Sequence, residues 1–149
     1  MRRRLARKYA LHILYQAEIR PDEPVEKIMS EFWERVKPDP EVRKFAELLV
    51  RGTIQHLQKI DELIDEISEH WELHRMAAID RCILRFAAFE ILYLADIPPA
   101  VSINEAIEIA KEFSTEDSSR FINAILDRIK ERADQVVELE RLMTSEGEA

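Results

Sequence analysis

Basic and aromatic residues share one face of the first predicted helix, which spans residues 3–19. At about 3.6 residues per turn, this face carries Arg4, Lys8, Leu11 and Tyr15, with Arg7 and His12 beside them. Arginine and lysine side chains pair with phosphates, and a tyrosine ring can stack on an unpaired base. The face therefore predicts a site for single-stranded nucleic acid, although solvated bases and a tyrosine that packs inside the protein would give the same pattern.

The charge distribution supports this interpretation. The first 20 residues carry six basic side chains and one acidic side chain, whereas the whole chain has a net charge of −8. A basic segment on an acidic body is typical of a local polyanion site, although a solubilising tail would have the same composition. Leu11 and Tyr15 offer too little apolar area on this face for a helix that lies on a membrane.

A second polar cluster lies in the predicted connection between residues 113 and 121. Phe113 and Phe121 bracket a segment that offers hydroxyl groups, backbone amides and one base, Arg120, at the start of a helix. Helix N-termini attract phosphate groups, but Glu116 and Asp117 oppose that attraction here. The residues alone therefore favour a capping loop between two core phenylalanines.

No catalytic, metal or cofactor site is predicted. His70 and His74 have a spacing that can chelate a metal on a helix, but no glutamate directly follows the first histidine and no third ligand is identifiable. Cys82 lies in an apolar segment, where a free cysteine usually acts as a small hydrophobic residue. The two glycines, Gly52 and Gly147, cannot form a glycine-rich phosphate loop. The chain is therefore predicted not to be an enzyme.

The elements that must position these residues are predicted to be helices. Apolar residues recur at helical spacing in six segments: 3–19, 25–36, 42–68, 79–94, 103–110 and 121–129. Because glycine is too scarce for a β-rich fold, we expect one all-α domain over residues 1–149, with six to seven helices. The segment 79–94 is apolar on most sides, which is typical of a central helix surrounded by others.

Several finer features follow from single residues. Gly52 is expected to mark a bend within 42–68, and Ser102 with Glu105 has the pattern of a capping box. The last residues, from about 144, are expected to be disordered. The lone cysteine, the lack of a secretory signal and the lack of an apolar run of about 20 residues predict a cytoplasmic protein without a membrane span.

Several strings resemble those of the NusB family of bacterial transcription antitermination factors in order and spacing. They include Arg3-Arg4-Leu5-Ala6-Arg7, Trp71-Glu72-Leu73-His74-Arg75-Met76, Ile83-Leu84-Arg85, Asn104-Glu105-Ala106 and Phe121-Ile122-Asn123. The resemblance extends over about residues 3–130. Two positions depart from the family pattern, since Leu5 stands where an arginine run often continues and Ala124 stands where glycine is common.

The resemblance implies an all-α fold of two packed helical subdomains and a function without enzymatic activity. It implies binding of the single-stranded boxA element of ribosomal RNA leader transcripts together with NusE, a small-subunit ribosomal protein. The pair would then join an RNA polymerase antitermination complex. Some members of the family self-associate, which leaves a homodimer open. The rival interpretation is a helical adaptor that binds proteins and makes no direct contact with RNA.

The resemblance also assigns site residues. It places one part of the RNA-binding motif on the first helix: Arg3, Arg4, Arg7 and Tyr15. It places a second RNA element on the later connection, against the capping interpretation above: Phe113, Asp117, Ser118, Arg120 and Phe121. The NusE surface maps to the start of the central helix, where Asp80 is the candidate contact. Lys8 joins the RNA-binding set through its place on the basic face.

Overall fold

The computed structural model describes residues 2–69 and 75–148, and their side chains except those of 136–141 and 144–148. These residues form seven helices and no strand: α1 (Arg2–Ile19), α2 (Val25–Arg35), α3 (Pro40–Gln55), α4 (Leu57–Ile67), α5 (Ala78–Tyr93), α6 (Pro99–Phe113) and α7 (Glu116–Glu148). The predicted all-α class is therefore confirmed. None of the helices described is long and apolar enough to cross a membrane.

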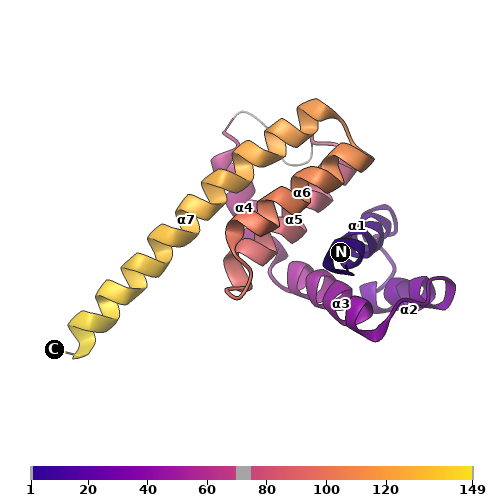
Figure 1. Cartoon of the computed structure of the whole chain (residues 1–149), viewed down its shortest axis with the longest axis horizontal. Helices are drawn as coiled ribbons and strands as arrows, with labels where there is room; N and C mark the ends of the chain where they lie inside the picture. Colours follow the sequence, from indigo (N-terminus) through magenta and orange to yellow (C-terminus); the bar gives the residue numbers. More distant parts are fainter. Residues whose placement is uncertain (1, 70–74, 149) are drawn as a thin grey trace.

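The helices form two packed subdomains, as predicted. Helices α1, α2 and α3 pack together on one side, and α4, α5, α6 and α7 pack together on the other (Figure 1). Helices α1 and α3 also lie against α5, which joins the two groups. Apolar residues on most sides of α5 are buried, including Ile83, Leu84, Phe86 and Ala87. The apolar segment 79–94 is thus the central helix because neighbours cover it on several sides.

The predicted long helix over 42–68 is two helices, and the break lies at His56 instead of Gly52. His56 ends α3 and precedes α4, and its ring stacks on Tyr93 with 3.9 Å between centroids. Gly52 lies inside α3, where an added Cβ would be 2.0 Å from Cζ of Phe89. The glycine therefore permits a close approach of α3 to the ring of Phe89 and does not produce a bend.

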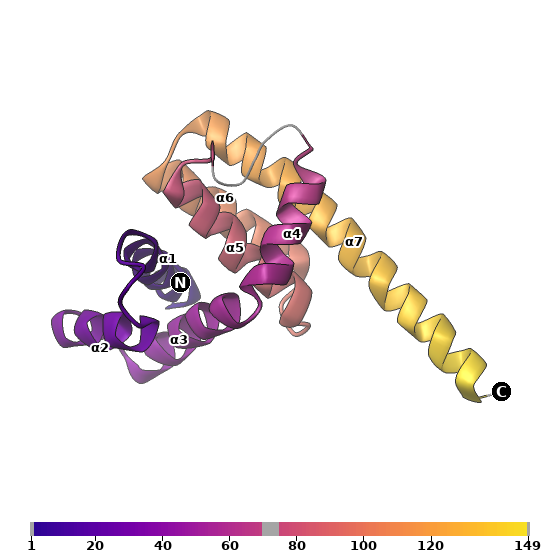
Figure 2. The same cartoon turned by 180° about the vertical axis from the view of Figure 1, so that it is seen from behind.

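Helix α7 is much longer than its apolar pattern predicted. Its backbone is helical to Glu148, past residue 144, where the sequence predicts the start of a disordered tail. Glutamate, leucine, arginine and methionine, which favour helix, are frequent between residues 131 and 143, so the helix can continue without packing. Its last turns project from the body of the protein (Figures 1 and 2).

Candidate nucleic-acid interface

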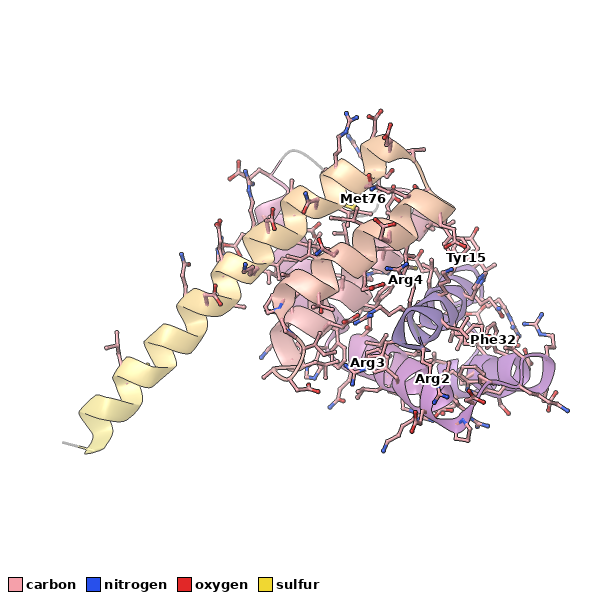
Figure 3. The ribbon with its side chains drawn as sticks, in the orientation of Figure 1. Arg2, Arg3, Arg4, Tyr15, Phe32 and Met76 are labelled. Carbon is pink, nitrogen blue, oxygen red and sulfur yellow. The ribbon has the colours of Figure 1, made fainter. Side chains whose placement is uncertain are left out.

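The outer face of α1 carries most of the predicted basic and aromatic residues. Arg3 is exposed, Arg4 and Lys8 are partly exposed, and Tyr15 is 36% exposed. Figure 3 shows Arg3 and Arg4 toward the N-terminal end of this helix and Tyr15 toward the other end. The structure thus confirms that Tyr15 lies on the outer face. Leu11, predicted on the same face, is buried in the core.

Two of these bases are paired with carboxylates of α6. Arg4 donates two hydrogen bonds to Glu105, from Nε to Oε2 at 2.6 Å and from Nη2 to Oε1 at 3.1 Å. Lys8 Nζ lies 2.8 Å from Oε2 of Glu112. The hydrogen bonds and the charge of Arg4 lower the pKa of Glu105, so this carboxylate stays ionised beside the basic face. Any phosphate that binds Arg4 or Lys8 must compete with these acids.

Arg7 does not lie on the exposed face, so that part of the prediction is wrong. Its side chain is 2% exposed and donates two hydrogen bonds to Glu90 of α5, from Nε at 2.8 Å and from Nη2 at 2.7 Å. Its guanidinium also lies 5.4 Å from the ring centroid of Phe45. Arg7 lies between the buried face and the outer face of α1, and α5 packs over this part of the helix. It therefore joins the two subdomains and is not available to a phosphate.

The predicted capping box at Ser102 is also wrong. Helix α6 begins at Pro99, so Ser102 already lies inside it, where its hydroxyl donates a 2.9 Å hydrogen bond to Oε1 of Glu90. Glu105 turns to Arg4 instead of reaching back to the helix start. Because the ring of proline fixes the backbone for a first helical turn, α6 begins without a side-chain cap.

Aromatic contacts connect α1 to the end of α6. The exposed His12 ring stacks near Phe32 of α2, at 6.3 Å between centroids, and meets the half-buried Phe113 edge-on at 5.7 Å. The second predicted RNA element begins at Phe113 and continues into the first turns of α7. The structure therefore brings Phe113 to the outer part of α1, which spacing along the sequence alone did not show.

The predicted connection over residues 113–121 is helical from Glu116 onward, and this start of α7 presents two charged residues to solvent. Asp117 and Arg120 are exposed, and Nη1 of Arg120 lies 3.8 Å from Oδ1 of Asp117. Ser118 is partly buried, and its backbone N–H donates a 3.0 Å hydrogen bond to Oγ1 of Thr115. Phe121 is half-buried and packs against the core. Asp117 and Arg120 are thus placed for an external ligand, whereas Phe121 is shared between surface and core.

Asp80 lies under the start of α7 instead of on the surface. It is 6% exposed, and its Oδ2 accepts a 2.7 Å hydrogen bond from the hydroxyl of Ser118. The exposed carboxylate expected here is therefore not found, and a direct contact of Asp80 with a partner stays a prediction. An acidic residue in the first turn of a helix suits the helix dipole, and here Asp80 also fixes the start of α7 to the start of α5.

The described residues contain no group of three or more His, Cys, Asp or Glu side chains placed to hold a metal ion. His70 and His74 lie outside the described residues. Cys82 is buried, and burial raises the pKa of its thiol to about 12. A thiol with this pKa remains protonated near neutral pH and is a poor nucleophile.

Comparisons with known proteins agree with this arrangement. A family model described as the NusB family matches residues 4–131. The transcription antitermination protein NusB of Thermodesulfovibrio yellowstonii is 45% identical over 140 residues, which cover 87% of this chain and 91% of the relative. The protein of the same name from Salinispora arenicola is 48% identical over 132 residues, which cover 88% of this chain and 96% of the relative.

Solved structures share the fold. T. maritima NusB is 42% identical and superposes with a TM-score of 0.81, over 87% of this chain and 90% of that chain. A complex of the antitermination factors NusB and NusE with double-stranded RNA contains a chain that is 23% identical. That chain has a TM-score of 0.78, and the match covers 88% of this chain and 97% of the other.

Proposed function

The chain belongs to the NusB family, and we propose from this premise that it is an RNA-binding transcription antitermination factor. The relatives that carry this name are aligned over 91% and 96% of their length, so the comparison is not limited to one segment of them. Antitermination factors are regulatory proteins, so the chain is not an enzyme.

We propose that its RNA ligand is the single-stranded boxA element and that it binds this element together with NusE. Support for joint binding comes from a protein of the same fold that forms a complex with NusE and double-stranded RNA, whereas the single-stranded boxA element is what the family resemblance implies. The protein pair would then join an RNA polymerase antitermination complex in the cytoplasm, where bacterial transcription takes place.

One observation carries the proposed site: Arg4, Lys8 and Tyr15 follow the outer face of a single helix, and Arg3 stands beside this face with its guanidinium 4.7 Å from the ring centroid of Phe45. Phosphates would pair with Arg3, Arg4 and Lys8, which spread along the first two turns of α1. An unpaired base would stack on the exposed ring of Tyr15. Arg7 is left out of the contact set because Glu90 holds it inside the protein.

The start of α7 would extend the RNA path beyond α1. Arg120 can pair with a phosphate, and the carboxylate of Asp117 can accept a hydrogen bond from a base amino group or a ribose hydroxyl. Phe113 links this segment to α1 through its contact with His12. Ser118 and Phe121 support the segment through their contacts with Asp80 and the core.

The start of α5 remains the proposed NusE-facing region, with an indirect role for Asp80. Because Asp80 holds Ser118, a partner that binds over the start of α5 would also act on the segment that carries Asp117 and Arg120. This arrangement offers a route by which NusE could increase affinity for RNA without contacting the RNA-binding face of α1.

The proposal is tested by titrating labelled boxA RNA with this chain, alone and with NusE, against a scrambled RNA of equal length. We expect specific binding of boxA that is tighter with NusE. The rival adaptor function has one observation in its favour, since Arg4 and Lys8 already have internal partners. Full binding to NusE without any binding to boxA RNA, with or without NusE, would select the adaptor.

A further inference from the structure

Arg3 differs from the other exposed bases at the start of α1 in what its side chain contacts. Arg2, Arg4 and Lys8 each pair with a glutamate, at 3.0, 2.6 and 2.8 Å respectively. Arg3 has no ion pair and no side-chain hydrogen bond within the described part of the chain, and its guanidinium carbon lies 4.7 Å from the ring centroid of Phe45 on α3. A phosphate that binds Arg3 therefore displaces no described carboxylate.

The contact between Arg3 and Phe45 is a cation–π interaction. The faces of an aromatic ring are electron-rich and attract a guanidinium group that lies over them. This attraction restrains the side chain of Arg3 without using a hydrogen-bond acceptor. The N–H donors of the guanidinium group thus remain available, and two of them can bind one phosphate in parallel.

The ring of Phe45 is itself held in place by the fold. Phe45 is half-buried and packs against the hydrophobic core. The guanidinium of Arg7, which Glu90 fixes inside the protein, lies 5.4 Å from the same ring centroid. Because the ring is fixed, Arg3 is partly ordered before RNA arrives and loses less conformational freedom when a phosphate binds.

Two carboxylates, Glu41 and Glu47, line the same groove as Arg3. Glu41 pairs with Arg2, and Glu47 pairs with bases of its own helix, α3. The net charge of this groove therefore does not select an anion. The selective feature is one unpaired guanidinium group that an aromatic ring holds in position.

We propose that Phe45 is a positioning residue for RNA binding, which holds Arg3 ready for a phosphate of the RNA backbone. This inference rests on the proposed function and adds α3 to the helices that determine RNA affinity. Phe45 acts through Arg3 and makes no contact with RNA of its own. Loss of the ring should cost about two- to fivefold in affinity, as expected for a cation–π contact at an exposed site.

A double-mutant cycle on the binding of labelled boxA RNA to the full chain, with NusE present, tests this role. We expect Phe45→Leu to lower affinity about two- to fivefold in the wild-type background and to have no further effect in the background of Arg3→Ala. Arg4→Ala is the matched control, since Arg4 pairs with Glu105 of α6. In that background Phe45→Leu should retain its full effect.

A second comparison separates positioning from a general loss of structure. Phe45→Tyr keeps the aromatic ring and should bind RNA like the wild type, whereas Phe45→Met, which is close to phenylalanine in volume, should behave like Phe45→Leu. Far-UV circular dichroism and thermal unfolding establish that each variant is folded at the temperature of the binding assay, and Phe45→Met replaces Phe45→Leu in the cycle if the latter is not.

Two results would overturn the positioning role alone. One is an equal loss of affinity from Phe45→Leu in the wild-type, Arg3→Ala and Arg4→Ala backgrounds, which is the result of a merely structural role. The other is wild-type affinity for both folded variants that lack the ring. If the wild type itself does not bind boxA RNA, the proposed function fails and this inference fails with it.

Discussion

Replacement of Arg7 by methionine should destabilise the fold far more than the same replacement of an exposed base of α1. Among the described residues, the variant leaves the carboxylate of Glu90, which is 0% exposed, with only the hydroxyl of Ser102 as a hydrogen-bond donor. Removing one partner of a buried ion pair costs about 3–5 kcal/mol. That is a large share of the roughly 5–15 kcal/mol by which a domain is stable. Since each kcal/mol shifts the Tm of a domain of this size by about 2–4 °C, we expect a loss of roughly 6–20 °C.

Thermal and urea unfolding, followed by far-UV circular dichroism, measure this effect. Lys8→Met is the matched control, because its ion pair with Glu112 lies at the surface and should contribute less than about 1 kcal/mol. A double variant, Arg7→Met with Glu90→Leu, should recover much of the lost stability, since replacing both charges leaves neither unpaired. If Arg7→Met melts like the wild type but loses RNA affinity, Arg7 is a phosphate contact and the burial argument is wrong.

Three further changes have distinct expected results. Glu105→Gln should raise RNA affinity roughly two- to fivefold, because it frees Arg4 from a surface ion pair. Glu108→Gln, the control, should change RNA affinity less, and filter binding at low salt compares the two variants. Gly52→Ala should lower the free energy of unfolding by about 1–3 kcal/mol through overpacking, and no change in a urea titration would contradict the close approach. Tyr15→Ala should cost about 1–3 kcal/mol of RNA affinity in fluorescence titration, and a changed salt dependence would contradict stacking.

Much of the fold could be predicted from the sequence because apolar spacing records which face of each helix is buried. The central position of α5 followed from its apolar residues on most sides, and the all-α architecture of six to seven helices followed from the same periodicity. Spacing does not show where a continuous pattern divides, so the break at His56 was missed. Its position depends on contacts of α3 with α5, including the approach of Gly52 to Phe89.

The candidate site was predicted only in part, since periodicity places a side chain around its own helix but does not say what covers it. Tyr15 and Arg3 lie on the surface as expected, whereas Arg7 is covered by α5. One signal could have shown this, because Glu90 is an acid within the most apolar segment of the chain and needs a buried cation. The burial of Asp80 beneath Ser118 depends on a contact over 38 residues and had no comparable local signal.

The most direct test of the proposed RNA-binding face is the salt dependence of boxA RNA affinity, for the wild type and for a variant with alanine at Arg3, Arg4 and Lys8. If these three bases and Arg120 each neutralise one phosphate, the slope of log K against log salt should be roughly −2.8, at about 0.7 per contact for a single strand. The variant should bind weakly, with a slope of about −0.7 from the contact of Arg120. A flat slope for the wild type, or an unchanged slope and affinity for the folded variant, would contradict RNA binding by α1.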